Sequence, residues 1–199
     1  MTAAGVISLA ALLATIGSLG YLHIAPTGLS PLRNAVSQYG ITPYKAGYRA
    51  ATLAFSAAGL ALALAVSQAL HDRGSATIAM LIVFAAARAA ISWFPMDRPG
   101  TPHTQTGGIH ALLAIAAFGS ATAAAFRLAG ALSQPGAWHT LAGTSRALGW
   151  LMLACLIAMA LTRRLAALGR WFGAIERGFY VSAIAWFATF AIAAATHAH

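Results

Sequence analysis

Four side chains able to carry charge meet at one boundary of a chain that has very little charge. Arg88 lies six residues before the end of an apolar stretch, Asp97 lies in the loop that follows, and His110 opens the next apolar stretch. Glu176 begins the last such stretch, with Tyr180 one helical turn deeper on the same face. Only three acids occur in 199 residues. We therefore expect a polar pocket at this boundary, with guanidinium donors and one titratable imidazole.

Arg88 and Asp97 each allow two interpretations. At 1.5 Å per residue, Arg88 lies about 9 Å inside the boundary, where a charge needs a partner or a route to the interface. We expect Asp97 to be its first partner and Glu176 its second. Alternatively, Asp97 bonds the amides of its own turn, which Pro95 initiates.

Further candidate ligand-binding residues lie near the same boundary: Arg98, directly after Asp97, and Ser37 and Tyr39 in the first loop. This set provides donors for phosphate or carboxylate but no evident activated nucleophile. We therefore expect a non-catalytic module that binds lipid or another amphiphile, or that supports a membrane-protein partner or a homo-oligomer. Membrane lipids, anionic ones in particular, are the expected ligands, and no cofactor is expected.

An intramembrane metal-dependent lipid hydrolase is one alternative. His23, His103, His110, Asp97 and Ser37 all lie towards this side. Catalytic zinc needs three protein ligands and an open position, and the residue types for it are present. Their spacing does not support it, because no histidine pair at i, i+4 occurs near the site.

A carrier of haem b is a second alternative. His23 ends the first apolar stretch and His110 begins the fourth at the same predicted depth, as ligation by two histidines requires. His71 and His139 fall at the opposite boundary. Each of these four lies at the edge of a stretch rather than well inside it, which weakens this alternative.

The composition identifies lipid as the solvent of this chain. Sixty per cent of the residues are hydrophobic, eight per cent are charged and the mean hydropathy is +0.75. A soluble globule has roughly a quarter of its residues charged. The net charge of +9 would favour nucleic acid in a soluble protein, but here the basic residues fall mainly in loops, so no nucleic-acid partner is expected.

Six apolar stretches, each about long enough to cross a roughly 30 Å hydrocarbon layer as a helix, fill most of the chain. No alternating pattern suggests a barrel, so the sequence predicts one all-α domain, a bundle of six transmembrane helices over residues 1–199. The predicted spans are Ala4–Leu22, Tyr48–Leu70, Ala76–Phe94, Ile109–Leu132, Arg146–Thr162 and Ala174–Ala195.

Basic residues predict the orientation of the helices. Eight of them lie in or beside the loops after the first, third and fifth spans: Arg33, Lys45, Arg49, Arg98, Arg163, Arg164, Arg170 and Arg177. Arg73, Arg127 and Arg146 lie on the other side. This bias predicts that both termini of this multi-pass protein lie in the periplasm or exterior and that the polar pocket lies on the cytoplasmic side of the inner (plasma) membrane.

Two local patterns complete the expected fold. Ser30 as N-cap, Pro31 at the first position and Gly40 as a stop predict a short helix over Pro31–Tyr39, lying in the cytoplasmic interface. Small residues at helical spacing predict that the fourth span lies inside the bundle. They are Ala114, Ala117, Ala121 and Ala124.

Several short motifs resemble a known family. They are Arg88, Phe94-Pro95-x-Asp97, Gly108-x-His110, Ser37-x-Tyr39-Gly40, and Glu176-Arg177 leading to Trp186. Together they resemble a bacterial and archaeal six-helix family known only as domain of unknown function 998 and, more distantly, the eukaryotic Frag1/DRAM/Sfk1 membrane proteins. The resemblance covers nearly the whole chain and implies its fold and which positions matter, but it implies no reaction.

Overall fold

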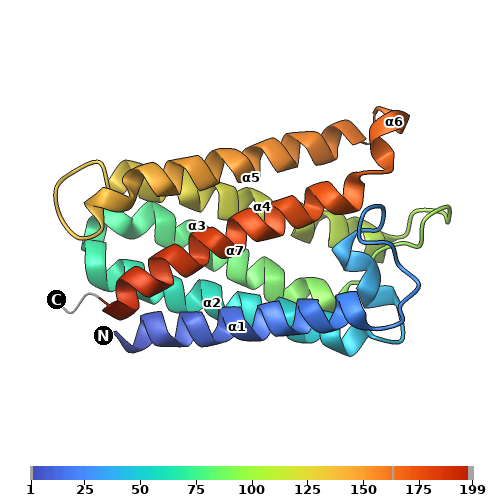
Figure 1. Cartoon of the computed structure of the whole chain (residues 1–199), viewed down its shortest axis with the longest axis horizontal. Helices are drawn as coiled ribbons and strands as arrows, with labels where there is room; N and C mark the ends of the chain where they lie inside the picture. The colour runs from blue at the N-terminus through green and yellow to red at the C-terminus, as the bar shows by residue number, and fades with distance from the viewer. Residues whose placement is uncertain (1, 163, 197–199) are drawn as a thin grey trace.

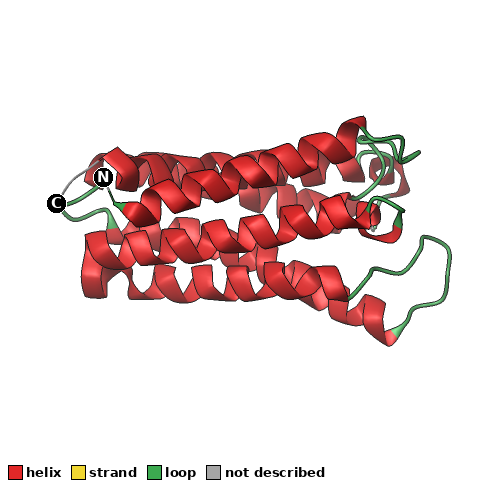
Figure 2. Ribbon diagram, turned by 90° about the horizontal axis from the view of Figure 1, so that it is seen from below, coloured by secondary structure: helices red, strands yellow, loops and turns green. Residues whose placement is uncertain are grey.

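The computed structural model describes residues 2–162 and 164–196, and all regular structure in these residues is helical (Figure 2). Arg163, counted above in the basic bias, lies outside the described residues. The long helices run along one axis (Figure 1): α1 (Ala3–Ile24), α2 (Lys45–Leu70), α3 (Ser75–Ala90), α4 (Gln105–Ala131), α5 (Ala142–Thr162) and α7 (Phe172–Thr196). The short ones are α6 (Ala166–Gly169) and the 3₁₀ helices η1 (Val36–Ile41), η2 (His71–Gly74), η3 (Ile91–Trp93) and η4 (His139–Leu141).

The all-α prediction is confirmed, and the chain has the helices of a membrane-embedded protein. Within the described residues, five helical segments are long and apolar enough to cross a membrane. One of them, Lys45–Trp93, is 49 residues long. It bends at His71, where α2 ends because the backbone adopts a φ of 50°, and η2 then leads into α3. The two helices pack together, and Ser56 Oγ on α2 donates to the carbonyl of Ala85 on α3 at 2.7 Å.

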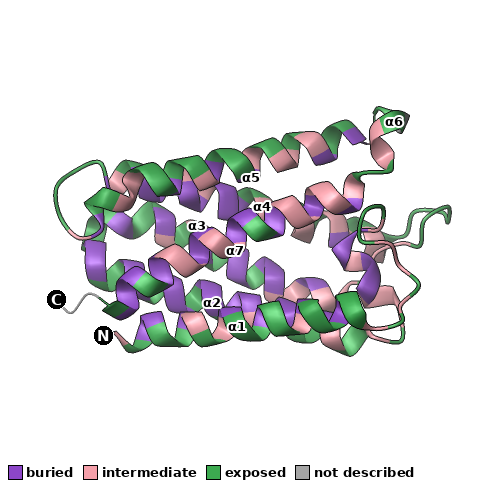
Figure 3. Cartoon of the chain, viewed as in Figure 1, coloured by how far each residue is buried: buried purple, intermediate pink, exposed green. Residues whose placement is uncertain are grey.

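The core lies between the helices, as the buried faces in Figure 3 show. Ala117, Ala121 and Ala124 of α4 are completely buried and Ala114 is partly buried, so the small residues form the buried face of this helix, whereas Leu112 and Ile115 on its other side are exposed. A buried chain of hydrogen bonds joins three helices beside them. Trp186 Nε1 on α7 donates to Ser145 Oγ on α5 at 2.8 Å, and Ser145 donates to the carbonyl of Ala125 on α4 at 2.8 Å.

Both ends of the bundle are defined by how the chain connects its helices. The start of α1 and the end of α7 meet at one end, where Thr2 Oγ1 donates to the carbonyl of Ala194 at 2.9 Å. The opposite end, which we call the loop end, carries residues 25–44, 94–104 and 164–171 (Figure 1). All the candidate pocket residues except the deeper Arg88 and Tyr180 lie at or beside the loop end.

The expected interfacial helix over Pro31–Tyr39 does not form. Residues 31–33 make a turn, in which the amides of Arg33 and Asn34 both donate to the carbonyl of Ser30. The helical segment is instead η1, which is a 3₁₀ helix and is packed against α2 and α7 with Val36 and Tyr39 only 1% exposed. Tertiary contacts from α7, described below, hold this conformation in place of the α-helix that the local signals favour.

Candidate functional site

Arg88 is enclosed within the bundle and bonds a phenol instead of an acid. Its side chain is 1% exposed, and Nη1 donates to Tyr180 Oη at 3.0 Å. The guanidinium carbon lies 5.5 Å from the centre of the Tyr180 ring and 5.8 Å from that of Phe55. No carboxylate among the described residues lies within 4 Å of it, and its Nε has no hydrogen-bond partner there. Two aromatic faces and one phenol therefore stabilise this cation.

The predicted ion pair between Arg88 and Asp97 does not form. The Asp97 carboxylate is instead hydrogen-bonded to Thr104 at the start of the next helix. Its Oδ1 accepts from Thr104 Oγ1 at 2.6 Å, and its Oδ2 accepts from the Thr104 amide at 3.1 Å. Thr104 is itself the N-cap of α4 and accepts from the amide of Gly107 at 3.0 Å. Asp97 therefore bonds within its own loop, the second interpretation that the sequence allowed.

The environment of Asp97 favours its charged form. The hydrogen bonds from Thr104 hold the pKa of this carboxyl below its usual value, and the nearby His103 ring, at 3.6 Å, acts in the same direction. A depressed pKa stabilises the fold above the unfolded-state pKa of about 3.9, and this contribution is lost as the pH falls through the lower, folded value.

Gly107 tests this cap. A β-carbon at Gly107 would collide with the Asp97 carboxylate, whereas one at Gly108 would meet nothing within 4 Å. We expect Gly107→Ala to lower the melting temperature in detergent and Gly108→Ala to leave it unchanged or raise it, since alanine favours the helix. The difference between the two should begin to shrink only below the unfolded-state pKa of about 3.9, and it should continue to shrink as the pH falls through the lower pKa that Asp97 has in the fold. Equal melting temperatures at pH 7 would contradict the role of Asp97 as a cap.

Glu176 holds the first loop on α7. It is 4% exposed, and its Oε2 accepts from the backbone amide of Val36, the first residue of η1, at 2.7 Å. Three residues earlier, Gly173 packs directly against the backbone of Pro31 and Asn34. The amide of Ala174 also donates to the carbonyl of Leu32 at 3.0 Å. The start of α7 is thus a docking surface for the first loop.

Arg177 is a second residue of α7 that holds the first loop, a role that the sequence did not predict. Its Nη1 donates to the carbonyls of Asn34 and Gly173, both at 2.9 Å, and its Nη2 donates to Tyr39 Oη at 3.2 Å. Its Nε donates to His23 Nε2 at 2.7 Å. The Glu176-Arg177 dipeptide was visible in the sequence, but nothing there indicated that both side chains reach back to residues 23–39.

His23 and His110 both serve as hydrogen-bonding residues. His23 Nδ1 lies 2.6 Å from the carbonyl of Leu19, which can only accept, so Nε2 is the acceptor for Arg177. His110 is buried, with Nδ1 2.7 Å from the carbonyl of Phe94. Within residues 2–162 and 164–196, no group of three histidine, cysteine or acidic side chains is placed to hold a metal ion. The described residues therefore offer no three-ligand set for the zinc alternative, and the haem alternative, which needs two histidines, stays a prediction.

The predicted residues thus share one region of the molecule but not one cavity. Ser37 Oγ donates a hydrogen bond to Met96 Sδ at 3.1 Å, which links the first loop to the turn after α3. Tyr39 is buried against His23, with ring centres 5.6 Å apart. Of the predicted pocket residues, Arg98 alone lines the cavities described at the loop end, whereas Arg88, His110, Glu176 and Tyr180 are buried.

The larger cavity lies between the first loop, the start of α2 and the turn after α3, and has a volume of about 580 Å³. Lys45, Arg49 and Arg98 line it, and no acid is among its described lining residues. We call it the basic cavity. The Arg49 guanidinium carbon lies 4.9 Å from the centre of the Trp93 ring. Its remaining lining residues are Gly40, Ile41, Thr42, Pro43, Ser92, Trp93, Pro95 and Met96.

The match to known families agrees with the motifs and the fold. The family described as "Protein of unknown function (DUF998)" matches residues 8–193, nearly the whole chain, and the chain belongs to this family. The expected distant similarity to the Frag1/DRAM/Sfk1 proteins is not shown by this match. No curated protein and no solved structure matches the chain.

Proposed function

We propose that this protein binds the anionic head group of a membrane lipid in the basic cavity without transforming it. The observation that carries the proposal is the charge of the cavity: three cations and, among the described lining residues, no acid. Lysine and arginine near a membrane surface each attract anionic head groups by about 1 kcal/mol. The basic cavity replaces the Arg88, Asp97 and His110 pocket expected from sequence.

The placement of two of these cations is unfavourable unless an anion is present. Lys45 and Arg49 are four residues apart on the first turns of α2, where like charges repel. They also lie at a helix N-terminus, which favours negative charge. The Ser92 hydroxyl adds a polar group that is buried and has no partner among the described residues. A bound phosphate would relieve the repulsion and accept hydrogen bonds from all of these groups.

This function requires a particular orientation. We propose six membrane crossings, with the 49-residue segment Lys45–Trp93 crossing twice, in a bacterial inner membrane. The bias of basic residues would place the loop end in the cytoplasm and both termini outside. Anionic lipids of the cytoplasmic leaflet would then reach the basic cavity. Fusions of a cytoplasm-specific reporter to the C-terminus should be inactive, and an active fusion would reverse this orientation.

A charge-matched pair of variants tests the binding. We expect delipidated wild type to retain added phosphatidylglycerol in native mass spectrometry and Lys45→Gln/Arg98→Gln to lose at least tenfold in affinity, as about 1 kcal/mol per cation implies. The control Arg33→Gln/Arg164→Gln removes the same charge from two exposed positions at the loop end that do not line the cavity. Equal loss in both variants would reduce the effect to net charge and refute a specific site.

Thermal stability separates binding from folding in the same variants. Because Lys45 and Arg98 contribute charge to a repulsive cluster, the lipid-free double variant should melt no lower than wild type. Phosphatidylglycerol should raise the melting temperature of wild type but not of the variant. A lipid-free variant that melts well below wild type would indicate a structural role for these cations.

A further inference from the structure

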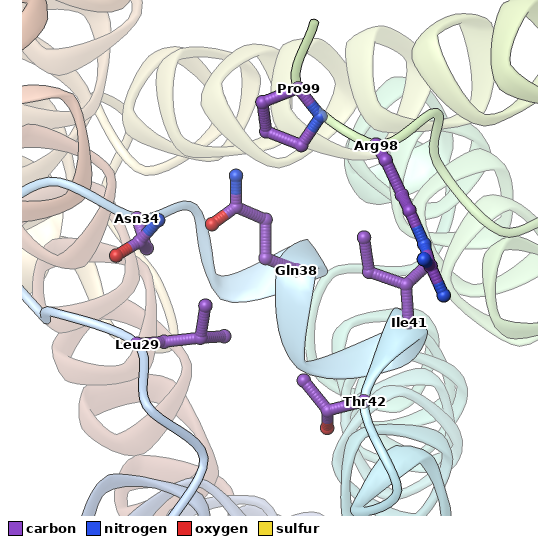
Figure 4. Close-up of a pocket in the computed structure, with 7 residues that line it drawn as sticks. All are labelled: Leu29, Asn34, Gln38, Ile41, Thr42, Arg98 and Pro99. Atoms are coloured by element: carbon purple, nitrogen blue, oxygen red, sulfur yellow. The ribbon is translucent and has the colours of Figure 1, made fainter. Parts of the chain in front are cut away.

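We infer that the bound head group carries hydroxyl groups beyond its phosphate, as glycerol phosphate does, and that Gln38 recognises them. This inference rests on the proposed function and specifies its ligand. A second cavity of about 270 Å³ lies beside the basic cavity, lined by Leu29, Asn34, Gln38, Ile41, Thr42, Arg98 and Pro99 (Figure 4). The two cavities share Ile41, Thr42 and Arg98, so one ligand can occupy both.

Gln38 is a polar lining residue of this second cavity whose side-chain oxygen has no hydrogen-bond partner among the described residues. It is 8% exposed, and its Oε1 is buried. Figure 4 shows its amide extending from η1 into the space between Asn34 and Pro99. The side-chain oxygen of Asn34, in contrast, already has a partner, because Oδ1 accepts a hydrogen bond from the amide of Ser30 at 2.7 Å. A buried acceptor without a hydrogen-bond partner is unfavourable, and a donor on a ligand would remove that cost.

The chemistry of the two cavities defines the ligand class. The basic cavity takes the phosphate, and Arg98 lies at the junction of the two. Beyond it, the Gln38 carbonyl needs a donor, which a hydroxyl or an ammonium group can supply. No acid lines either cavity within the described chain, and three cations would repel an ammonium group. A phosphate ester of a polyol therefore fits better than phosphatidylethanolamine, and better than phosphatidic acid, which has no hydroxyl-bearing head group.

Lipids with the same acyl chains test the inference. For the full chain in detergent, we expect phosphatidylglycerol to bind about three- to tenfold more tightly than phosphatidylethanol, a diester of the same charge whose head group has no hydroxyl, which is the range that one neutral hydrogen bond provides. Gln38→Leu should abolish this preference while phosphatidylethanol still binds. The control Gln68→Leu removes an exposed amide on α2 that lines neither cavity and should keep the preference.

The outcomes separate this inference from the proposed function. Weaker binding of both lipids by Lys45→Gln/Arg98→Gln than by its control would support the proposed phosphate site, whether or not Gln38 has a role. Wild type that binds both lipids equally, or Gln38→Leu that keeps the preference, would overturn the role of Gln38 and leave the basic cavity intact. If soluble glycerol 3-phosphate displaces the lipid, the natural ligand can be a free phosphate ester. If it does not bind while the lipid does, the natural ligand is a membrane lipid.

Discussion

Replacing Gly173 with alanine should destabilise the protein by about 1–3 kcal/mol, the usual cost of overpacking, and release the first loop. A β-carbon there would lie 2.5 Å from the carbonyl oxygen of Pro31 and 2.6 Å from that of Asn34. Both are backbone atoms, and the loop that carries them is bonded to Ala174 and Arg177 of the same helix. The loop cannot move aside without breaking those bonds.

Two measurements and one control decide this prediction. The free energy of unfolding can be measured in detergent, and trypsin can report the loop through cleavage after Arg33, which is exposed. We expect faster cleavage at Arg33 in Gly173→Ala. Gly119→Ala is the matched control, because a β-carbon at this position of α4 meets nothing within 4 Å. Unchanged stability and unchanged cleavage in Gly173→Ala would show that the first loop is not held by α7.

Replacing Tyr180 with phenylalanine should lower the free energy of unfolding by about 1.5–3 kcal/mol, the range for a hydrogen bond to a charged group. Tyr180→Phe keeps the ring that faces the Arg88 guanidinium but removes the acceptor of Nη1. Since Arg88 Nε already has no partner among the described residues, the buried cation would lose the hydrogen bond that the structure shows for it. Tyr44→Phe is the control, because the Tyr44 hydroxyl makes no hydrogen bond in the described chain.

A double-mutant cycle identifies the partner of Arg88. Once Arg88→Met has removed the charge, Tyr180→Phe should cost much less than it does in wild type, so the two losses should not add. Arg88→Met combined with Asp97→Asn should be additive, because Asp97 bonds Thr104 instead. Additive losses for Arg88 and Tyr180, or strong coupling between Arg88 and Asp97, would contradict the arrangement described above.

Hydrophobic composition determined the class of this fold without any tertiary information. The long apolar stretches predicted the helices to within a few residues at most ends, because a chain in lipid must satisfy its backbone hydrogen bonds internally. The small residues at Ala117, Ala121 and Ala124 correctly predicted a buried face, because close helix contacts in lipid require small side chains. The motifs also predicted the family, which the match over residues 8–193 confirmed.

The conformation of the first loop was decided by tertiary structure. Local signals from Ser30 and Pro31 favoured an α-helix over Pro31–Tyr39. Glu176, 140 residues away in the sequence, instead accepts the amide of Val36 at the start of a 3₁₀ helix. A hydrogen bond between such distant residues has no local signature, so a single sequence could not reveal it.

The sequence by itself determined which polar residues lie near one end of the bundle, because helix boundaries fix depth. It could not determine their partners, because depth does not specify which faces of the helices meet. The opposite charges of Arg88 and Asp97 predicted an ion pair between them. In the structure Asp97 accepts a hydrogen bond from Thr104 at the start of α4, and Arg88 donates to Tyr180. From the sequence, Lys45 and Arg49 were assigned only to topology, and Arg98 was assigned both to topology and to a pocket with Asp97. Only the packing of the first loop against the turn after α3 brings them around one cavity.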